Sequence, residues 1–393
     1  MKLAVVTETF PPEINGVATS IARMLEALER RGHCVLITRP RQAGDCAGSG
    51  DLESRTTITV RGFPLPGYPG LRFGLPAAST LREVWSRDRP DLVHVVTEGP
   101  LGWSAVSAAR RLGLPVTSDF RTHFDHYSGH YGYGWIRHGV SRYLRRFHAR
   151  TDLTFVPTER LSSDLAQQGY SNLRVVGRGI DARLFHPGRR SSDLRGRWGL
   201  GPDDLAIIYV GRIAPEKNLD LVLRAFEAIR RERHEARLVF VGDGPALASL
   251  QHAAPEHVYA GMRAGEDLAR HYASGDLFLF PSLTETFGNV TLEALASGLG
   301  VVAFDYAAAG ELVQHGENGM LAPLGNGGAF VEHAVRLATK PQLLSSVRER
   351  ARTSIATRHW DAIVSVWLEH LEACVARYRS INDGKTGIFL AAD

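Results

Sequence analysis

Short apolar runs alternate with amphipathic segments along the first half of the chain. The apolar runs have the length of buried strands and lie at Leu3–Thr7, Cys34–Thr38, Thr57–Arg61, Asp91–Val96, Pro115–Asp119 and Leu153–Pro157. Segments with helical spacing, such as Val17–Arg31 and Trp103–Leu112, lie between them. Strands that alternate with helices predict an α/β domain built on a parallel sheet with helices on both faces.

The same pattern begins again in the second half. Its strand-like runs are Leu205–Gly211, Arg237–Gly242, His257–Gly261, Leu277–Phe280 and Gly300–Phe304. The polar, turn-rich segment 185–193 is the best candidate for a linker between the two sheets. The pattern predicts two doubly wound domains, residues 1–185 and 186–360, with an active site in the cleft between them. A last helix, 361–378, follows the strands of the second domain.

The composition fits a two-domain globular protein. The chain has 393 residues, of which 44% are hydrophobic, enough for two cores. It has no run of about eighteen apolar residues, and Met1–Glu8 is expected to be a first strand and not a signal peptide. Cys34, Cys46 and Cys374 have no metal-ligand spacing and cannot all pair, which favours a reducing cytoplasm and makes zinc an unlikely ligand.

Charge is distributed unevenly along the chain. Residues 1–185 hold 24 Lys and Arg against 17 Asp and Glu, or +7, whereas the remainder holds 22 against 25, or −3. The first half is therefore expected to meet something anionic. No nucleic-acid recognition motif is present, so a membrane surface or a phosphorylated acceptor is favoured over nucleic acid.

Two carboxylates eight residues apart, Glu285 and Glu293, are the most informative feature of the sequence. They bracket a turn between the apolar run Asp276–Pro281 and a helical segment, Val290–Ser297, that stops at Gly298. The carboxyl edge of a parallel sheet binds ligands, and a helix that begins there offers N–H groups to an anion such as a diphosphate. One carboxylate would then hold sugar hydroxyls and the other ribose hydroxyls.

Two further loops place candidate phosphate ligands at strand ends. Gly16 follows the first strand and precedes a helix, where bare backbone can approach a phosphate. Arg212 and Lys217 follow the first strand of the second half. Fixed cations at this place stabilise the charge that develops on a departing diphosphate.

These motifs together resemble glycosyltransferase family 4, a large group of retaining enzymes with the GT-B fold. The segment Glu285–Glu293 resembles the family's Glu-x7-Glu motif, and Gly211–Lys217 resembles its Gly-Arg-x5-Lys segment. Gly177–Asp181, with Phe185 soon after, resembles the segment that enters the interdomain linker. The resemblance covers residue 1 to about 375, and it implies that the last helix crosses back to the first domain.

The resemblance implies a set of site residues. In family members a histidine just past a strand of the first domain lies near the donor sugar, and His123 is favoured for this place over His126. The implied catalytic residues are His123, Arg212, Lys217 and Glu285. The implied donor-binding residues are Gly16, Arg212, Lys217, Glu285, Thr286, Phe287, Gly288, Asn289, Val290 and Glu293. Glu98 and Asp243 also end strands at the same edge and could line the cleft.

Two departures from the family pattern bear on this set. Many members carry two adjacent glycines in the first loop, where this chain has Asn15 and Gly16. Many also have a glycine pair where this chain has Ala308 and Ala309. In the first loop Gly16 alone matches the family pattern, and the alanines argue against close backbone contact with the donor in the second loop.

By resemblance, the reaction is transfer of a hexose, of mannose or glucose type, from a UDP- or GDP-sugar to an acceptor with retention of the α configuration. No nucleophilic carboxylate is evident near His123, so a front-face mechanism is expected, in which the leaving phosphate takes the acceptor's proton. No cofactor is implied, and with Arg212 and Lys217 on the phosphate no metal is required.

A basic and aromatic stretch, residues 120–150, points to the acceptor. It carries Arg121, Arg137, Arg142, Arg145, Arg146 and Arg150 against the single acid Asp125, interleaved with Tyr127, Tyr131, Tyr133, Trp135, Tyr143 and Phe147. Such a stretch suits an anionic membrane surface, although a solvated basic helix at the rim of the acceptor cleft remains the alternative. The resemblance to transferases that make mannolipids and glycosylate diacylglycerol implies a lipid or membrane-bound acceptor and a peripheral location on the cytoplasmic face.

Two other classes of protein stay open. A nucleotide-sugar epimerase of the same fold would also bind a sugar diphosphate, but it needs further acid and base groups. A catalytically inactive sugar-nucleotide binding module would not need Arg212, Lys217, Glu285 and Glu293 together.

Overall fold

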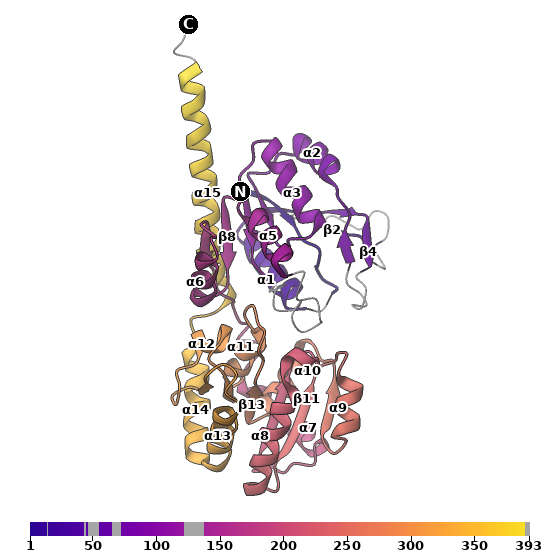
Figure 1. Ribbon diagram of the computed structural model, residues 1–393, viewed down its shortest axis with the longest axis vertical. Helices are drawn as coiled ribbons and strands as arrows, with labels where there is room; N and C mark the ends of the chain where they lie inside the picture. Colours follow the sequence, from indigo (N-terminus) through magenta and orange to yellow (C-terminus); the bar gives the residue numbers. More distant parts are fainter. Residues whose placement is uncertain (14, 43–44, 46–54, 65–71, 122–136, 390–393) are drawn as a thin grey trace. The chain divides into compact units, whose positions relative to one another are not determined.

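The computed structural model describes the chain except for residues 14, 43–44, 46–54, 65–71, 122–136 and 390–393. The described residues form two compact units (Figure 1). Among the described residues, unit 1 holds 1–121, 137–179 and 360–389, apart from the gaps given above, and unit 2 holds Ile180–His359.

Unit 1 is built on a seven-stranded parallel sheet in the order β3-β2-β1-β6-β7-β8-β9. Its strands are β1 (Lys2–Val6), β2 (Cys34–Pro40), β3 (Arg55–Val60), β6 (Leu92–Val95), β7 (Val116–Asp119), β8 (Leu153–Val156) and β9 (Leu173–Val175). A separate antiparallel pair is formed by β4 (Gly62–Pro64) and β5 (Arg72–Gly74). Because β1 lies between β2 and β6, the strand order reverses direction at the carboxyl ends of β1 and β6.

Side chains that alternate along β1 build two separate cores in unit 1. Leu3 and Val5 pack on the face covered by α1 and α15, whereas Ala4 and Val6 pack on the face covered by α2, α3 and α5. The helices are α1 (Gly16–Arg30), α2 (Ala78–Arg87), α3 (Pro100–Arg111), α5 (Arg137–His148), α6 (Glu159–Gln167) and α15 (Trp360–Phe389). The parallel sheet is thus covered on both faces, as its apolar strands require.

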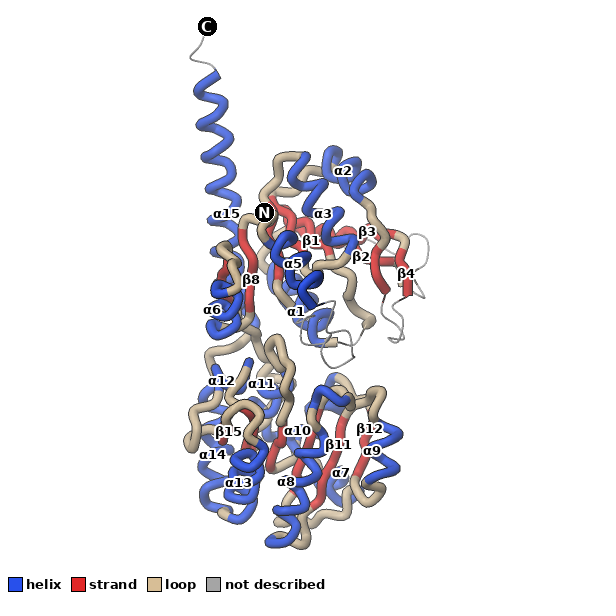
Figure 2. Tube along the Cα trace, viewed as in Figure 1, coloured by secondary structure: helices blue, strands red, loops and turns tan. Residues whose placement is uncertain are grey.

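Unit 2 contains a six-stranded parallel sheet in the order β12-β11-β10-β13-β14-β15 (Figure 2). Its strands are β10 (Ala206–Val210), β11 (Arg237–Val241), β12 (Val258–Gly261), β13 (Leu277–Phe280), β14 (Gly300–Phe304) and β15 (Met320–Ala322). Its helices are α7 (Ser192–Arg197), α8 (Leu219–Glu232), α9 (Leu247–Ala253), α10 (Gly265–Ser274), α11 (Asn289–Ala296), α12 (Ala307–Leu312), α13 (Gly327–Thr339) and α14 (Pro341–Ser354), with short 3-10 turns at Pro187–Arg189 and Pro215–Lys217. Here β10 lies between β11 and β13, so the strand order reverses at the carboxyl ends of β10 and β13.

The division between the units falls earlier than the sequence boundary at 185. Ile180 and Phe185 both pack into the core of unit 2, and the Ile180 N–H donates to the carbonyl of Arg358 at 2.8 Å. The polar segment 185–193 therefore lies within unit 2, because Phe185 is an apolar anchor at its start.

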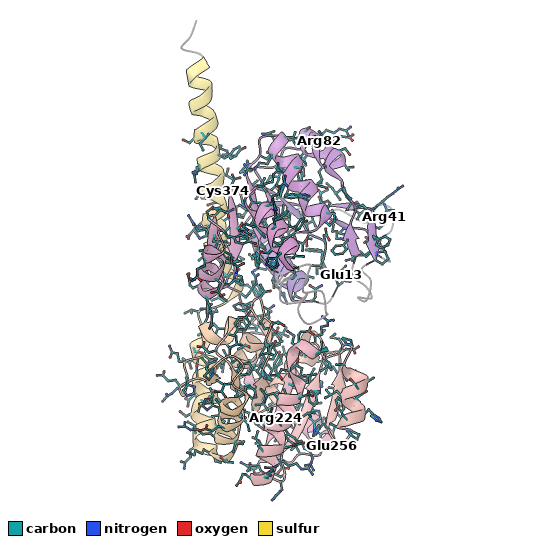
Figure 3. The ribbon with its side chains drawn as sticks, viewed as in Figure 1. Glu13, Arg41, Arg82, Arg224, Glu256 and Cys374 are labelled. Carbon is teal, nitrogen blue, oxygen red and sulfur yellow. The ribbon has the colours of Figure 1, made fainter. Side chains whose placement is uncertain are left out.

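The last helix belongs to unit 1, to which the family resemblance assigned it. Val364, Trp367 and Leu371 of α15 are fully buried against the face that carries Leu3 and Val5. Cys374, labelled in Figure 3, is buried on the same helix and is a free thiol, whereas Cys34 is exposed and also free. No helix in the described part of the chain is both long and apolar enough to cross a membrane.

Candidate functional site

The loops that follow β10 and β13 meet at the point where the sheet of unit 2 reverses its strand order. Glycines shape the first of these loops. Gly211 has φ +151° and Gly242 has φ +141°, and a Cβ on Gly242 would lie 1.9 Å from the Gly211 carbonyl oxygen. Side chains are excluded there, so the loops after β10 and β11 can lie against each other and leave the β13 side of the edge for a ligand.

Lys217 and Glu285 form the centre of this edge. Lys217 is buried, and its ammonium forms an ion pair with the Glu285 carboxylate. The same ammonium donates to the Thr284 carbonyl at 3.2 Å and to Ser282 Oγ at 3.3 Å. Ser282 Oγ in turn donates to Glu285 Oε1 at 2.9 Å. The residues that the sequence assigned to phosphate and to sugar are thus in direct contact.

Arg212 lies beside this pair with a partly exposed guanidinium. Its Nη1 is 3.5 Å from Oε1 of Glu216, a carboxylate that is almost fully buried. The Arg212 carbonyl accepts a hydrogen bond from the buried hydroxyl of Tyr209 at 2.9 Å. Buried groups of unit 2 therefore hold both the backbone of Arg212, through the Tyr209 hydroxyl, and its side chain, through the Glu216 carboxylate. Sequence reasoning missed Glu216, although its place directly before Lys217 was a usable signal.

The turn from Glu285 to Val290 leads into α11. Gly288 caps the helix in the left-handed conformation, with φ +92° and ψ +65°, which a residue with a side chain rarely adopts. Thr286, Asn289 and Val290 are partly exposed around it. Phe287 is buried in the core and its carbonyl accepts from the Ala308 N–H at 2.7 Å, so its side chain supports the turn from inside unit 2.

Glu293 lies one turn into α11 and is partly buried. Oε2 of its carboxylate accepts a hydrogen bond from the hydroxyl of Tyr272 at 2.9 Å. Burial raises the pKa of Glu293 to about 7, against the lowering effect of the Tyr272 hydrogen bond. Tyr272 could not be predicted as a partner of Glu293 from the sequence, because it lies on α10, 21 residues earlier in the chain.

Unit 1 also holds carboxylates at its strand-order reversal. Glu8 follows β1, and its Oε1 accepts from the Leu101 N–H at the start of α3 at 3.2 Å. Burial raises the pKa of Glu8 to about 8; the Leu101 hydrogen bond opposes this rise, and the nearby charge of Glu98 adds to it. Glu98 is itself buried, with Oε1 3.5 Å from His148 Nε2.

In the first loop of unit 1, Asn15 stands where many family members have a glycine, and its side chain has a structural role. The side-chain oxygen of Asn15 accepts from the Val17 N–H at 3.1 Å and from the Ala18 N–H at 2.8 Å, so this residue caps α1. Those two N–H groups are engaged, and the predicted ligand Gly16 stands exposed at the helix start. His123, the other predicted residue of this unit, lies outside the described residues, as does His126.

The basic stretch 120–150 is described only in part. Arg121 is buried in an ion pair with Asp119, with Nε 2.5 Å from Oδ2, and Phe147 is buried in the core. These two side chains do not reach the surface, contrary to the prediction, because the strand end and the helix's inner face draw them inward. Exposed side chains on and just after α5 are Arg142, Tyr143, Arg145, Arg146 and Arg150, and the Arg150 guanidinium lies 5.5 Å from the centre of the Trp103 ring. No group of three His, Cys, Asp or Glu in the described ranges is arranged to hold a metal ion.

The fold and this edge of unit 2 define a class of protein. A sucrose-phosphate synthase from Thermosynechococcus elongatus has the same fold, with a TM-score of 0.79 at 17% identity over 96% of this chain and 99% of that one. The Anabaena protein HepE, solved with UDP and glucose, has a TM-score of 0.74 at 19% identity over 95% of this chain and all of that one. The protein has the GT-B fold, in which two parallel-sheet α/β domains are joined in one chain.

Sequence comparison identifies the family. Residues 14–184 match the family described as Glycosyltransferase Family 4, and residues 204–340 match the description Glycosyl transferases group 1. A GDP-mannose-dependent alpha-mannosyltransferase of Mycobacterium tuberculosis is 35% identical over 96% of this chain and 98% of its own length. An alpha-monoglucosyldiacylglycerol synthase of Streptococcus pneumoniae is 30% identical over 77% of this chain and 71% of its own. The chain belongs to glycosyltransferase family 4 and is a hexosyltransferase.

Proposed function

We propose that this protein transfers mannose from GDP-mannose to a glycolipid or diacylglycerol acceptor, with the α configuration retained. The contact of Lys217 with Glu285, beside Arg212 at the carboxyl edge of unit 2, is the observation that carries the proposal. Relatives named as GDP-mannose-dependent alpha-mannosyltransferases match 96% of this chain in three bacteria, which favours GDP-mannose over a UDP-sugar as donor.

The proposed roles follow from charge and position. Arg212 and Lys217 neutralise the diphosphate as the bond from the sugar's anomeric carbon to the β-phosphate oxygen breaks, because negative charge grows on that oxygen. The same phosphate accepts the proton of the acceptor hydroxyl while the new bond forms on the same face of the sugar. Glu285 holds sugar hydroxyls, Glu293 holds ribose hydroxyls, and the N–H groups of the turn from Thr286 to Val290 face the diphosphate. By the family resemblance, Gly16 and His123 are also assigned to donor binding.

A bound metal is not needed in this scheme, since two cationic side chains serve the leaving group. The expected result is that EDTA leaves the initial rate unchanged. A rate that collapses with EDTA and returns with Mg²⁺ or Mn²⁺ would contradict this part of the proposal.

The exposed arginines of α5 are proposed to hold the protein against the inner face of the cytoplasmic membrane. Arg142, Arg145 and Arg146 point charge outward while Leu144 and Phe147 anchor the helix in unit 1. Guanidinium groups beside Tyr143 suit a surface of anionic headgroups. The alternative is that these arginines form a solvated rim.

Sedimentation with vesicles distinguishes binding to a membrane surface from a solvated rim of arginines. We expect the protein to sediment with vesicles of phosphatidylglycerol at low salt, and replacement of Arg142, Arg145 and Arg146 by glutamine to abolish this while leaving the melting temperature unchanged. The triple change Arg224→Gln, Arg230→Gln and Arg231→Gln on α8 of unit 2 is the matched control. Failure of the unaltered protein to sediment at low salt would rule out the membrane surface.

Incubation with a panel of GDP- and UDP-sugars and lipid acceptors tests the function itself. We expect GDP to be released from GDP-mannose only when a lipid acceptor is present. Release without an acceptor would instead indicate an epimerase or a hydrolase, and no turnover with any donor would indicate a binding module.

A further inference from the structure

The hydroxyl of Tyr272 lies against the carboxylate that we assign to the donor's ribose. Tyr272 is fully buried near the end of α10, and its ring packs edge-on to Phe185 with centres 5.7 Å apart and against Phe278 at 6.1 Å. These contacts fix the ring within the core of unit 2. The direction of its hydroxyl is therefore set by the fold and does not depend on a ligand.

The hydroxyl engages one side of the Glu293 carboxylate. Tyr272 donates to Oε2 at 2.9 Å, and this is the hydrogen bond that the structure records for the Glu293 side chain among the described residues. Glu293 remains partly exposed. A carboxylate has about four acceptor positions, so one oxygen can be held from inside the protein while the other accepts ligand hydroxyls.

We propose that Tyr272 is a positioning residue for donor binding, which holds the Glu293 carboxylate in one rotamer so that its free oxygen can accept the ribose hydroxyls. This inference rests on the proposed role of Glu293 in the donor site. The reason is chemical: a protonated carboxyl has lost part of its acceptor capacity, whereas a carboxylate fixed by a buried donor keeps it.

The surroundings of Glu293 make the ionised form sensitive to this hydrogen bond. Burial raises the pKa of Glu293 to about 7, and the Tyr272 hydrogen bond lowers it. Next to Tyr272, β10 contributes Tyr209, whose pKa burial raises well above its usual value, and the turn before α11 contributes Glu285, which pairs with Lys217. Tyr272's own helix, α10, carries Asp267 and His271, and further charged groups lie on the helices that pack against α11.

Two helices that pack against α11 also carry charged residues. Glu311 lies on α12, and Arg348 lies on α14, where its guanidinium donates hydrogen bonds to the Gly298 carbonyl and to Asp276. The causes that set the pKa of Glu293 are burial and Tyr272. Removing the Tyr272 hydroxyl should therefore raise the pKa of Glu293 further and move the ionisation on which donor binding depends to higher pH.

The experiment measures the Kd of GDP-mannose by calorimetry across pH 6 to 8.5 for the full-length protein. The sugar diphosphate is a diester and does not titrate in this range, so a change in Kd reports on the protein. For the unaltered protein we expect Kd to fall as pH rises through about 7, where Glu293 ionises. For Tyr272→Phe we expect this transition to move up by about one pH unit and Kd at pH 7 to rise about fivefold, with the two curves converging at high pH.

Three further variants make the result specific. Tyr259→Phe removes a hydroxyl that bonds backbone carbonyls of Leu250 and Ala254, and it should reproduce the unaltered curve. Glu293→Gln should weaken binding and flatten the pH dependence. In the Glu293→Gln background, Tyr272→Phe should cause no further shift with pH.

These variants test the role of Tyr272 separately from the ribose-binding role of Glu293, on which it depends. If Glu293→Gln leaves Kd unchanged, the ribose assignment fails. If Glu293→Gln weakens binding but Tyr272→Phe leaves the pH transition in place, Glu293 binds the donor and the role of Tyr272 is wrong. A Tyr272→Phe protein with a lower melting temperature but an unshifted transition would show that Tyr272 serves folding only. Protons released at pH 7, measured in two buffers of different ionisation enthalpy, give a second reading, and Tyr272→Phe should release more of them.

Discussion

At the scale of single residues, the sequence predicted which loops carry Lys217 and Glu285 but not the contact between these side chains. Lys217 and Glu285 were assigned to different parts of the donor, and the structure shows them as an ion pair that shares Ser282. Spacing along the chain places both residues at one sheet edge, because β10 and β13 are neighbours. It cannot show that an ammonium from one loop reaches a carboxylate from the other, nor that Tyr272 reaches Glu293, since those contacts depend on tertiary packing.

Replacing Lys217 by alanine tests the leaving-group role. We expect kcat to fall about 10²–10³-fold, because a fixed cation facing the departing phosphate is lost, with donor binding weakened to a smaller extent. Lys340→Ala removes an exposed lysine of the same unit and should leave kcat unchanged. A Lys217→Ala enzyme with the kcat of the Lys340→Ala control would contradict the assignment.

Glu8 makes the stability of unit 1 depend on pH. Its folded pKa of about 8 lies above the ordinary value of 4.5, so between these values the folded protein binds more protons than the unfolded chain, and stability falls as pH rises. Glu8→Gln keeps an acceptor for the Leu101 N–H but cannot ionise. Calorimetric scans at pH 5 to 8 should show a melting temperature for Glu8→Gln that is higher than the unaltered value by a few degrees at pH 8 and little changed at pH 5. Glu83→Gln on exposed α2 is the control, and parallel pH profiles for Glu8→Gln and the unaltered protein would refute the prediction.

At the scale of elements, the strongly apolar strands could be predicted, and the short or polar ones could not. Each predicted strand of both halves is present to within a few residues. The sequence analysis missed β9 and β15, which are three residues long and lie at sheet edges, and it missed the antiparallel pair of β4 and β5. Periodicity over three residues carries too little information to separate a strand from a loop. The sequence analysis also predicted that the last helix ends near residue 378, whereas α15 continues to Phe389. Residues 382–387 contain no apolar residue that would mark a helix.

The packing of α15 on unit 1 is expected to be a major source of that unit's stability. Trp367 is fully buried, and its ring meets His94 at 5.0 Å and Phe155 at 6.5 Å. Trp367→Ala should lower the free energy of unfolding by about 3–5 kcal/mol. The adjacent residue Val366 is 43% exposed, and Val366→Ala should cost no more than about 0.5 kcal/mol. Equal losses for the two variants in urea titrations would show that α15 does not contribute to this core.

At the scale of the whole molecule, two α/β units with different electrostatic character share one chain. The excess of positive charge lies in the first 185 residues, where α5 contributes the exposed residues Arg142, Arg145 and Arg146, whereas the carboxylates and cations proposed for the donor lie in unit 2. After Ile180–His359 the chain returns to unit 1 with α15. The organisation into two α/β units could be predicted, because the repeated strand and helix pattern and the order of the motifs are both visible in the sequence alone.

Which acceptor receives the sugar depends on the whole protein, and analysis of the reaction product identifies that acceptor. The most direct test incubates the protein with GDP-mannose and vesicles containing diacylglycerol or a mannosylated glycolipid, and determines the anomeric configuration of the lipid product by NMR. We expect an α-mannosyl lipid formed together with an equal amount of GDP. A β-linked product, or GDP released equally well without any lipid, would contradict it.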